Sequence, residues 1–352
     1  MNENTIKFEK ITACLDMAGC PNRCKHCWLG VTKNGNLTNS DLSYVADTFK
    51  PYTDKFEIAS WCREPDYKNN YKELWELENQ LSTEKTPHFE LMSFWRIVRD
   101  GEYVKWLYSL GVRVCQLTLF GMEETTDYYI GRKGAFQEIL KATDILLLNG
   151  IAPRLQIFVT KNNISELPLL ESLIVKMNLE RRCAEIGQRF QLFVWQGDCS
   201  GANEQFYDVW VTPEDIRKIP NEFVEYTIRH FGKSSINEVF GSTECKLYEE
   251  LIKEKTTQSI VSSKPVFNVD KDFNVFPNIT QPSPWLNLGN LKSDGVDVVI
   301  SNYLKCKSKV QASMIRIPIC DMVKQCGNSS SQRLFTKDDY ITYILNQYCK
   351  GL

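Results

Sequence analysis

Histidine is scarce in this sequence, and long apolar runs are missing. Three histidines occur among 352 residues, which excludes a histidine-rich metal centre and leaves few candidates for the histidine of a Ser-His-Asp triad. The strongest apolar run, residues 145–148, is far too short to cross a membrane. The N-terminus also lacks the basic-then-apolar order of a secretory signal. We therefore expect a cytoplasmic protein with no membrane partner.

An excess of charge of either sign is absent as well. The chain has 42 Lys and Arg against 44 Asp and Glu, for a formal net charge of -2, which argues against a nucleic-acid partner. Cysteine, in contrast, is plentiful, with 13 residues. A chain of this length without an export signal fits a reducing compartment better than a disulfide scaffold.

The most informative cysteines form a C-x3-C-x2-C motif at Cys20, Cys24 and Cys27, just after a strand expected at residues 11–15. Three thiolates from one loop are soft, convergent ligands that leave a tetrahedral or cubane site one ligand short. No second CxxC pair lies nearby to close a structural zinc site. Buried reduced cysteines or a zinc knuckle are the alternatives, although Asn22, Arg23 and Lys25 make a poor core segment.

From this loop onward, short β-rich runs alternate with amphipathic helical runs. Strands are expected at 11–15, 56–61, 88–94, 113–120, 154–160 and 190–195, and helices at about 39–50, 70–81, 103–110, 135–148 and 165–177. Parallel neighbours need such crossovers, so the pattern predicts an α/β fold, a partial (β/α)6 TIM-like barrel. Such folds place function at the C-terminal ends of the strands, and the cysteine motif follows the first one.

The composition changes after residue 200, which divides the chain into a core of residues 1–200 and a smaller part of residues 201–352. This second part is expected to be a helical linker followed by an α+β extension. Residues 266–269 and 274–276 form a hairpin pattern, and residues 288–295 lead into a further helix.

The cysteine motif resembles that of the radical S-adenosylmethionine (radical SAM) family. The resemblance implies a 4Fe-4S cluster with three irons held by Cys20, Cys24 and Cys27 and the fourth left for SAM. His26 stands where the family usually has an aromatic residue. Glu64 and Pro65, after the second strand, match the end of the family's Gly-Gly-Glu-Pro element, which binds the SAM amino group, but Cys62 and Arg63 replace its two glycines.

The resemblance extends to later strands and to the C-terminal part. It implies that Thr118, with Gln116 on the same face, contacts the SAM ribose and that Gln156 contacts the adenosine. Residues 266–295 resemble a SPASM or twitch extension, although the hairpin lacks the usual cluster-binding cysteine. The thiols available in this part are Cys245, Cys306, Cys320, Cys326 and Cys349. They are enough for one auxiliary iron-sulfur cluster or for a single zinc ion, and an extension without a cluster is the third alternative.

The function that the resemblance implies is reductive cleavage of SAM to a 5'-deoxyadenosyl radical, which abstracts hydrogen from a small metabolite or a peptide. An external one-electron reductant such as flavodoxin or ferredoxin is implied as a partner. Two other classes stay open. A zinc-stabilised binding module explains the cysteines but not the strand-helix order, and an iron-sulfur electron-transfer protein would normally add a fourth cysteine ligand.

Overall fold

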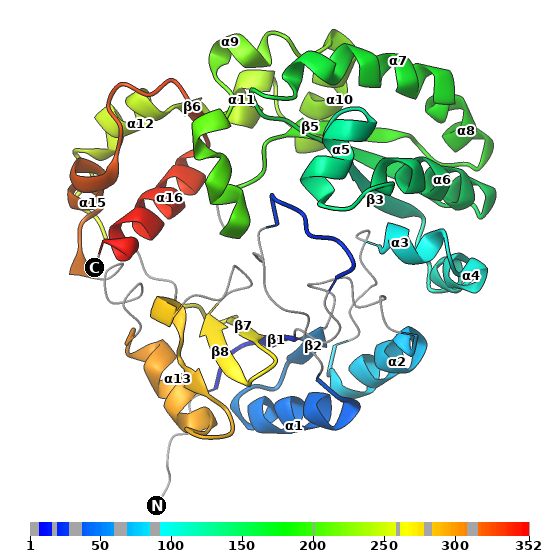
Figure 1. The fold of residues 1–352 in the computed structure, drawn as a ribbon. Helices are drawn as coiled ribbons and strands as arrows, with labels where there is room; N and C mark the ends of the chain where they lie inside the picture. Colours follow the sequence, from blue (N-terminus) through cyan, green and yellow to red (C-terminus); the bar gives the residue numbers. More distant parts are fainter. Residues whose placement is uncertain are drawn as a thin grey trace, which may run out of the picture.

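The protein is represented by a computed structural model that describes residues 7–15, 20–27, 37–59, 69–84, 92–199, 201–257, 261–277, 284–307 and 316–351. Within these ranges the chain forms an all-parallel sheet, β3-β4-β5, and a mixed sheet, β2-β1-β7-β8-β9, with helices on their outer sides (Figure 1). The chain is therefore an α/β protein, consistent with the predicted partial TIM-like barrel.

The all-parallel sheet shows how the sequence pattern sets the fold. It consists of β3 (Val114–Leu119), β4 (Ala152–Phe158) and β5 (Gln191–Trp195). Along β3, Cys115, Leu117 and Leu119 are buried against the helices, whereas Gln116 and Thr118 on the opposite face are half-buried. Successive strand side chains point to opposite faces, so the inner face is partly polar. The crossovers contain α5 (Glu123–Ile130), α6 (Ala135–Leu148), α7 (Leu167–Met177) and α8 (Leu179–Glu185).

The mixed sheet joins residues from the two ends of the chain. Strands β1 (Ile11–Leu15) and β2 (Phe56–Ala59) are parallel, and β1 also pairs in parallel with β7 (Val266–Val269). Strands β7 and β8 (Asn274–Pro277) form the predicted hairpin, and β9 (Gly289–Asn290) extends it. The outer helices are α1 (Asn39–Phe49), α2 (Tyr71–Leu81) and α13 (Val296–Leu304). The hairpin of the C-terminal part thus continues the sheet of β1 and β2; the division near residue 200 stays a prediction.

Most predicted elements are confirmed to within a few residues, with two differences. The sequence predicts that Asn39-Ser40-Asp41 caps α1, but the cap is Thr38. Its side chain accepts the Asp41 N–H, and Asp41 accepts the Thr38 N–H. The strand predicted at 88–94 lies mainly outside the described residues. The prediction is wrong for its last two residues, because Ser93 caps the short helix α3 (Phe94–Ile97).

The remaining elements of the described chain are helices and a two-stranded ribbon. β6 pairs antiparallel with β10, and α15 packs on α16. The bounds are α4 (Gly101–Ser109), α9 (Pro213–Ile216), α10 (Asn221–Phe231), α11 (Ile236–Phe240), β6 (Ser242–Thr243), α12 (Glu244–Leu251), α15 (Ile319–Cys326), β10 (Leu334–Phe335) and α16 (Lys337–Lys350).

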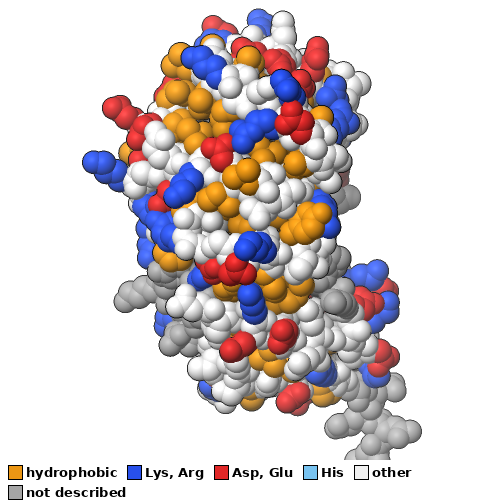
Figure 2. Space-filling model, turned by 90° about the vertical axis from the view of Figure 1, so that its right-hand side faces the viewer, with side chains coloured by type: hydrophobic (Ala, Val, Ile, Leu, Met, Phe, Trp, Pro, Cys, Tyr) orange, Lys and Arg blue, Asp and Glu red, His pale blue; other side chains and the backbone are white. Residues whose placement is uncertain are grey.

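The surface carries charges of both signs. Figure 2 shows Lys and Arg side chains interspersed with Asp and Glu across one face, with apolar side chains reaching the surface in several places. Among the described residues, no helix combines the length and apolar character that a membrane crossing requires.

Candidate active site

The loop of residues 20–27 is held against the C-terminal end of α5. The backbone N–H groups of Arg23 and Lys25 donate to the carbonyls of Ile130 and Tyr129, at 2.9 and 2.8 Å. A helix leaves its last carbonyls without partners in the helix, and here the loop satisfies two of them. Arg132 Nε adds a 2.8 Å hydrogen bond to Asn22 Oδ1. The cysteine loop is thereby fixed in the centre of the molecule, beside the β3-β4-β5 sheet (Figure 1).

His26 anchors the loop on the C-terminal ends of β3 and β4. Its ring centroid lies 4.7 Å from that of Phe120, directly after β3, and 4.8 Å from that of Phe158, the last residue of β4. Burial lowers the pKa of His26 to about 4, so the imidazole is neutral near pH 7. Its Nδ1 is buried without a hydrogen-bond partner among the described residues. The cysteine loop therefore lies at the C-terminal edge of the β3-β4-β5 sheet, and its role as the reaction centre stays a prediction.

Asn163 ties together the two strand ends that receive His26. Its Nδ2 donates to the carbonyl oxygens of Phe120 and Phe158 at 2.6 and 2.8 Å, and its Oδ1 accepts the Thr160 N–H at 2.6 Å. The side chain is 1% exposed, so water cannot replace these bonds. The sequence analysis missed this residue, since an asparagine after a strand usually marks only a turn.

Replacing Asn163 by alanine should therefore destabilise the protein by about 2 kcal/mol, because buried backbone groups lose their partners. The free energy of unfolding in urea measures this loss. The neighbouring Asn162 is exposed, and Asn162→Ala should change the free energy by less than about 0.5 kcal/mol. Equal losses in the two variants would contradict the bracing role of Asn163.

The three cysteines of the motif lie in this anchored loop. Cys20, Cys24 and Cys27 are all half-buried, and Arg23 Nη1 donates to the Cys20 carbonyl oxygen at 2.6 Å. In the part of the chain that the structure describes, no three His, Cys, Asp or Glu side chains are gathered as a metal site. The donor set nevertheless fits an iron-sulfur cluster in kind, as three thiols on one fixed loop. Their role as ligands, like the auxiliary cluster, stays a prediction.

The polar residues predicted on β3 and β4 are brought together. Thr118 pairs with Gln156 in the sheet register, and Gln116 pairs with Arg154. Gln116 Nε2 donates to Gln156 Oε1 at 2.8 Å, and Thr118 Oγ1 lies 3.4 Å from the same oxygen. Arg154 donates through Nε and Nη2 to Gln116 Oε1, at 3.1 and 2.8 Å. These residues form one connected network on the inner face of the sheet. Glu64 and Pro65 lie outside the described residues.

The C-terminal helix contributes an acid that the sequence analysis did not single out. Asp339, in the first turn of α16, is 8% exposed and accepts the Cys199 N–H at 2.8 Å, just beyond the end of β5. Burial, with the nearby Asp198 carboxylate, raises the pKa of Asp339 to about 8. Cys199 itself is fully buried, and burial raises the pKa of its thiol.

This raised pKa predicts a pH-dependent stability. The folded protein holds the Asp339 proton more tightly than the unfolded chain, so the contribution of this group to stability is full below about pH 4 and is lost as the pH rises through about 8. Asp339→Asn keeps an acceptor for Cys199 and should remove a loss of about 4 kcal/mol between pH 5 and 8. Urea unfolding at several pH values measures it. Asp338→Asn, at an exposed neighbour, should keep the wild-type slope; identical slopes in the wild type and Asp339→Asn would refute the assignment.

Comparison with known proteins supports the fold. No protein-family model and no curated protein matches this sequence. Among solved structures, native anSMEcpe with bound AdoMet is similar, with a TM-score of 0.54 and 14% identity over 97% of this chain and 99% of that chain. Native anSMEcpe with bound AdoMet and Kp18Cys peptide gives a TM-score of 0.52 and 13% identity, over 97% of this chain and 100% of that chain.

Native anSMEcpe with bound AdoMet and Cp18Cys peptide gives a TM-score of 0.52 and 14% identity, over 98% of this chain and 100% of that chain. At 13–14% identity, this similarity shows a shared fold and nothing further. It agrees with the resemblance drawn from the cysteine motif and with the position of the cysteine loop at the sheet edge. The chain therefore has a fold similar to that of AdoMet-bound anSMEcpe.

Proposed function

We propose that this chain is a radical SAM enzyme that abstracts hydrogen from a peptide or a small metabolite. The observation that carries the proposal is the place of the cysteine loop. His26 holds residues 20–27 on the C-terminal ends of β3 and β4, where parallel α/β folds build their reaction centres. The likeness to AdoMet-bound anSMEcpe over nearly the whole chain supports the same function.

Cys20, Cys24 and Cys27 would hold a 4Fe-4S cluster at this place. When bound, the cluster supplies the electron for reductive cleavage of SAM to methionine and a 5'-deoxyadenosyl radical. The chain itself supplies a fixed loop, aromatic side chains packed beneath it and surroundings of low polarity. Phe120 and Phe158 are buried below His26, so the loop rests on a dry surface that favours control of a reactive species.

The inner-face network supports a role for Gln156 in orienting SAM. A guanidinium can only donate hydrogen bonds, so Arg154 fixes Gln116 Oε1 as an acceptor. Gln116 Nε2 must then donate, and Gln156 Oε1 accepts it. This chain of bonds leaves Gln156 Nε2 as a donor for a ligand. An adenosine or ribose oxygen or nitrogen is a suitable acceptor, as the family resemblance implies for Gln156 and Thr118.

A peptide is the substrate class that the comparisons favour. anSMEcpe has been solved with two different peptides as well as AdoMet, and it aligns with 97–98% of this chain. A small metabolite remains the second candidate. In either case an external one-electron donor such as flavodoxin or ferredoxin would reduce the cluster.

The test is an anaerobic reconstitution of the full chain with iron and sulfide, followed by reduction and addition of SAM. We expect bound iron and sulfide, a change in the cluster spectrum on adding SAM, and formation of 5'-deoxyadenosine. A protein that retains zinc instead would favour the zinc-stabilised binding module. A cluster that never cleaves SAM would favour the electron-transfer protein.

A further inference from the structure

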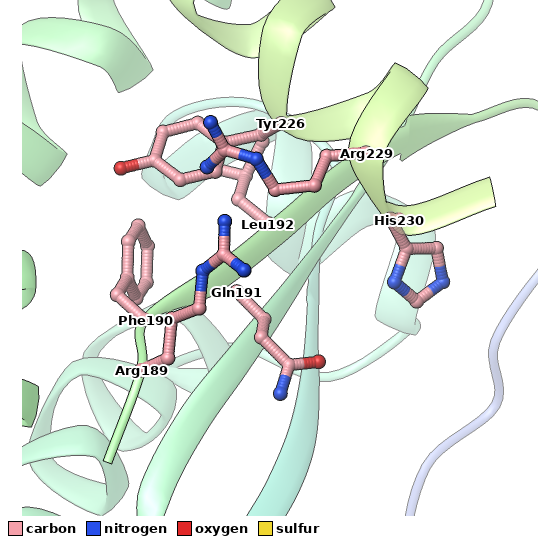
Figure 3. Close-up of a pocket in the computed structure, with 7 residues that line it drawn as sticks. All are labelled: Arg189, Phe190, Gln191, Leu192, Tyr226, Arg229 and His230. Carbon is pink, nitrogen blue, oxygen red and sulfur yellow. The ribbon is translucent and has the colours of Figure 1, made fainter. Parts of the chain in front are cut away.

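A cavity of about 210 Å³ lies where β5 begins, between this strand and α10. Figure 3 shows its side chains: Gln191 begins β5, Arg189 lies two residues before it, and Tyr226, Arg229 and His230 come from α10. This cavity belongs to neither the cysteine loop nor the Gln116–Gln156 network.

Two guanidinium groups meet in this cavity. Arg189 and Arg229 extend from opposite walls, and their charged ends face each other (Figure 3). Both side chains belong to exposed residues, and neither has a carboxylate partner within 4.0 Å among the described residues. The Arg229 guanidinium lies over the Tyr226 ring, 5.7 Å from its centroid. Two like charges therefore converge without a protein counter-charge.

The neighbouring acids are engaged elsewhere or lie apart. Glu180 accepts a hydrogen bond from the Tyr226 hydroxyl, which points away from Arg189 in Figure 3. Glu225, one turn before Arg229 on α10, forms no ion pair with it in the described structure, although i,i+4 pairs of this kind are common on helices. Glu222 lies near Glu171, Glu180 and Glu225, which together with burial raise its pKa. The acids thus gather near Glu222, and none of them pairs with Arg189 or Arg229 in the described structure.

Two polar residues complete the wall. Gln191 directs its amide toward the lower rim of the cavity, and His230 stands at the opposite end from the Tyr226 hydroxyl (Figure 3). The His230 ring stacks on Phe193, with centroids 4.0 Å apart and an interplanar angle of 6°, which fixes its orientation. The cavity therefore offers two guanidinium groups, with further hydrogen-bonding groups at its rim.

We propose that this cavity binds a phosphate group, either free or carried by a larger molecule. A guanidinium group can donate two parallel hydrogen bonds to phosphate oxygens, and two guanidinium groups balance the charge of a phosphate dianion. The site is distinct from the candidate SAM site, because it lies at the N-terminal end of β5. The cysteine loop lies at the C-terminal ends of β3 and β4, at the opposite edge of the same sheet, and β5 alone is about 17 Å long. SAM itself carries no phosphate.

The test is a calorimetric titration of the full chain with inorganic phosphate and, separately, with glycerol 3-phosphate, in a low-salt buffer without other anions. We expect binding that weakens at least about tenfold in Arg189→Gln/Arg229→Gln, because removing one charge-assisted hydrogen bond already weakens binding by roughly that factor. Arg181→Gln is the matched control, since Arg181 is exposed and pairs with Glu185 on α8 at 2.9 Å.

Tighter binding of glycerol 3-phosphate by at least about tenfold would assign the phosphate to a larger ligand, and equal binding would assign it to the free ion. Both results support the site. Absence of binding by the wild type, or equal binding by the wild type and the double variant, overturns it. A negative result would leave the proposed SAM chemistry unaffected, because the titration contains no SAM and the two arginines lie outside the candidate SAM site.

Discussion

Combined replacement of Cys20, Cys24 and Cys27 by alanine is expected to abolish 5'-deoxyadenosine formation. Without thiolates the loop has no ligands for an iron-sulfur cluster, so the rate should fall at least about 1000-fold. Iron and sulfide analysis, with product quantified by chromatography, measures both effects. Any iron that remains in the variant reports an auxiliary cluster bound elsewhere.

Cys183→Ala is the control for this experiment. Cys183 is fully buried on α8, away from the cysteine loop, so its loss should lower the free energy of unfolding by about 1–2 kcal/mol and leave iron binding intact. The triple variant should fold, because the bonds that hold the loop come from backbone groups and from Asn22. Wild-type product formation by the triple variant would refute the assignment of these cysteines.

Gly131→Ala is expected to displace the cysteine loop. Gly131 ends α5 with a positive φ of 70°, and a Cβ there would lie 2.5 Å from the Arg23 carbonyl oxygen. Alanine would incur the left-handed backbone cost and would also push the loop from the helix end. We expect a loss of about 3 kcal/mol in the free energy of unfolding and several-fold less iron after reconstitution.

The chain offers a close control three residues later. Gly134 has a similar φ of 81°, but a Cβ there would meet no atom within 4 Å. Gly134→Ala should therefore incur only the backbone cost, about 1 kcal/mol, and keep full iron loading. Urea unfolding and iron analysis on both variants separate backbone strain from displacement of the loop. If the two variants behave alike, the close approach of Gly131 to the loop is unimportant.

Much of the fold was predictable from local patterns. The helix at Ala135–Leu148 was predicted with its observed bounds, because its buried residues recur at helical spacing and Asn149-Gly150 ends it. The strand at Ile11–Leu15 and the hairpin strands were also predicted. The strand prediction at 88–94 is wrong at its described end, because Phe94 fits a strand by propensity but begins a helix that Ser93 caps.

The candidate site was predictable only in part. The cysteine spacing indicated a ligand loop, and strand alternation placed Gln116 and Thr118 on one face. The bracing by Asn163 and the hydrogen bond between Asp339 and Cys199 had no recognisable signal, since the latter pair is separated by 140 residues in the sequence. The convergence of Arg189 and Arg229 was likewise hidden, because two isolated arginines on separate elements form no motif.

The sequence by itself determined the alternation of strands and helices and the three thiols of one loop. These features depend on spacing within a few residues, which backbone geometry translates directly into a helix, a strand or a turn. Only the tertiary structure decided that β7 pairs with β1 and that the loop rests on α5, Phe120 and Phe158. Backbone hydrogen bonds and apolar packing hold these elements together, and because many residue types serve equally well there, the sequence leaves no distinctive pattern for them.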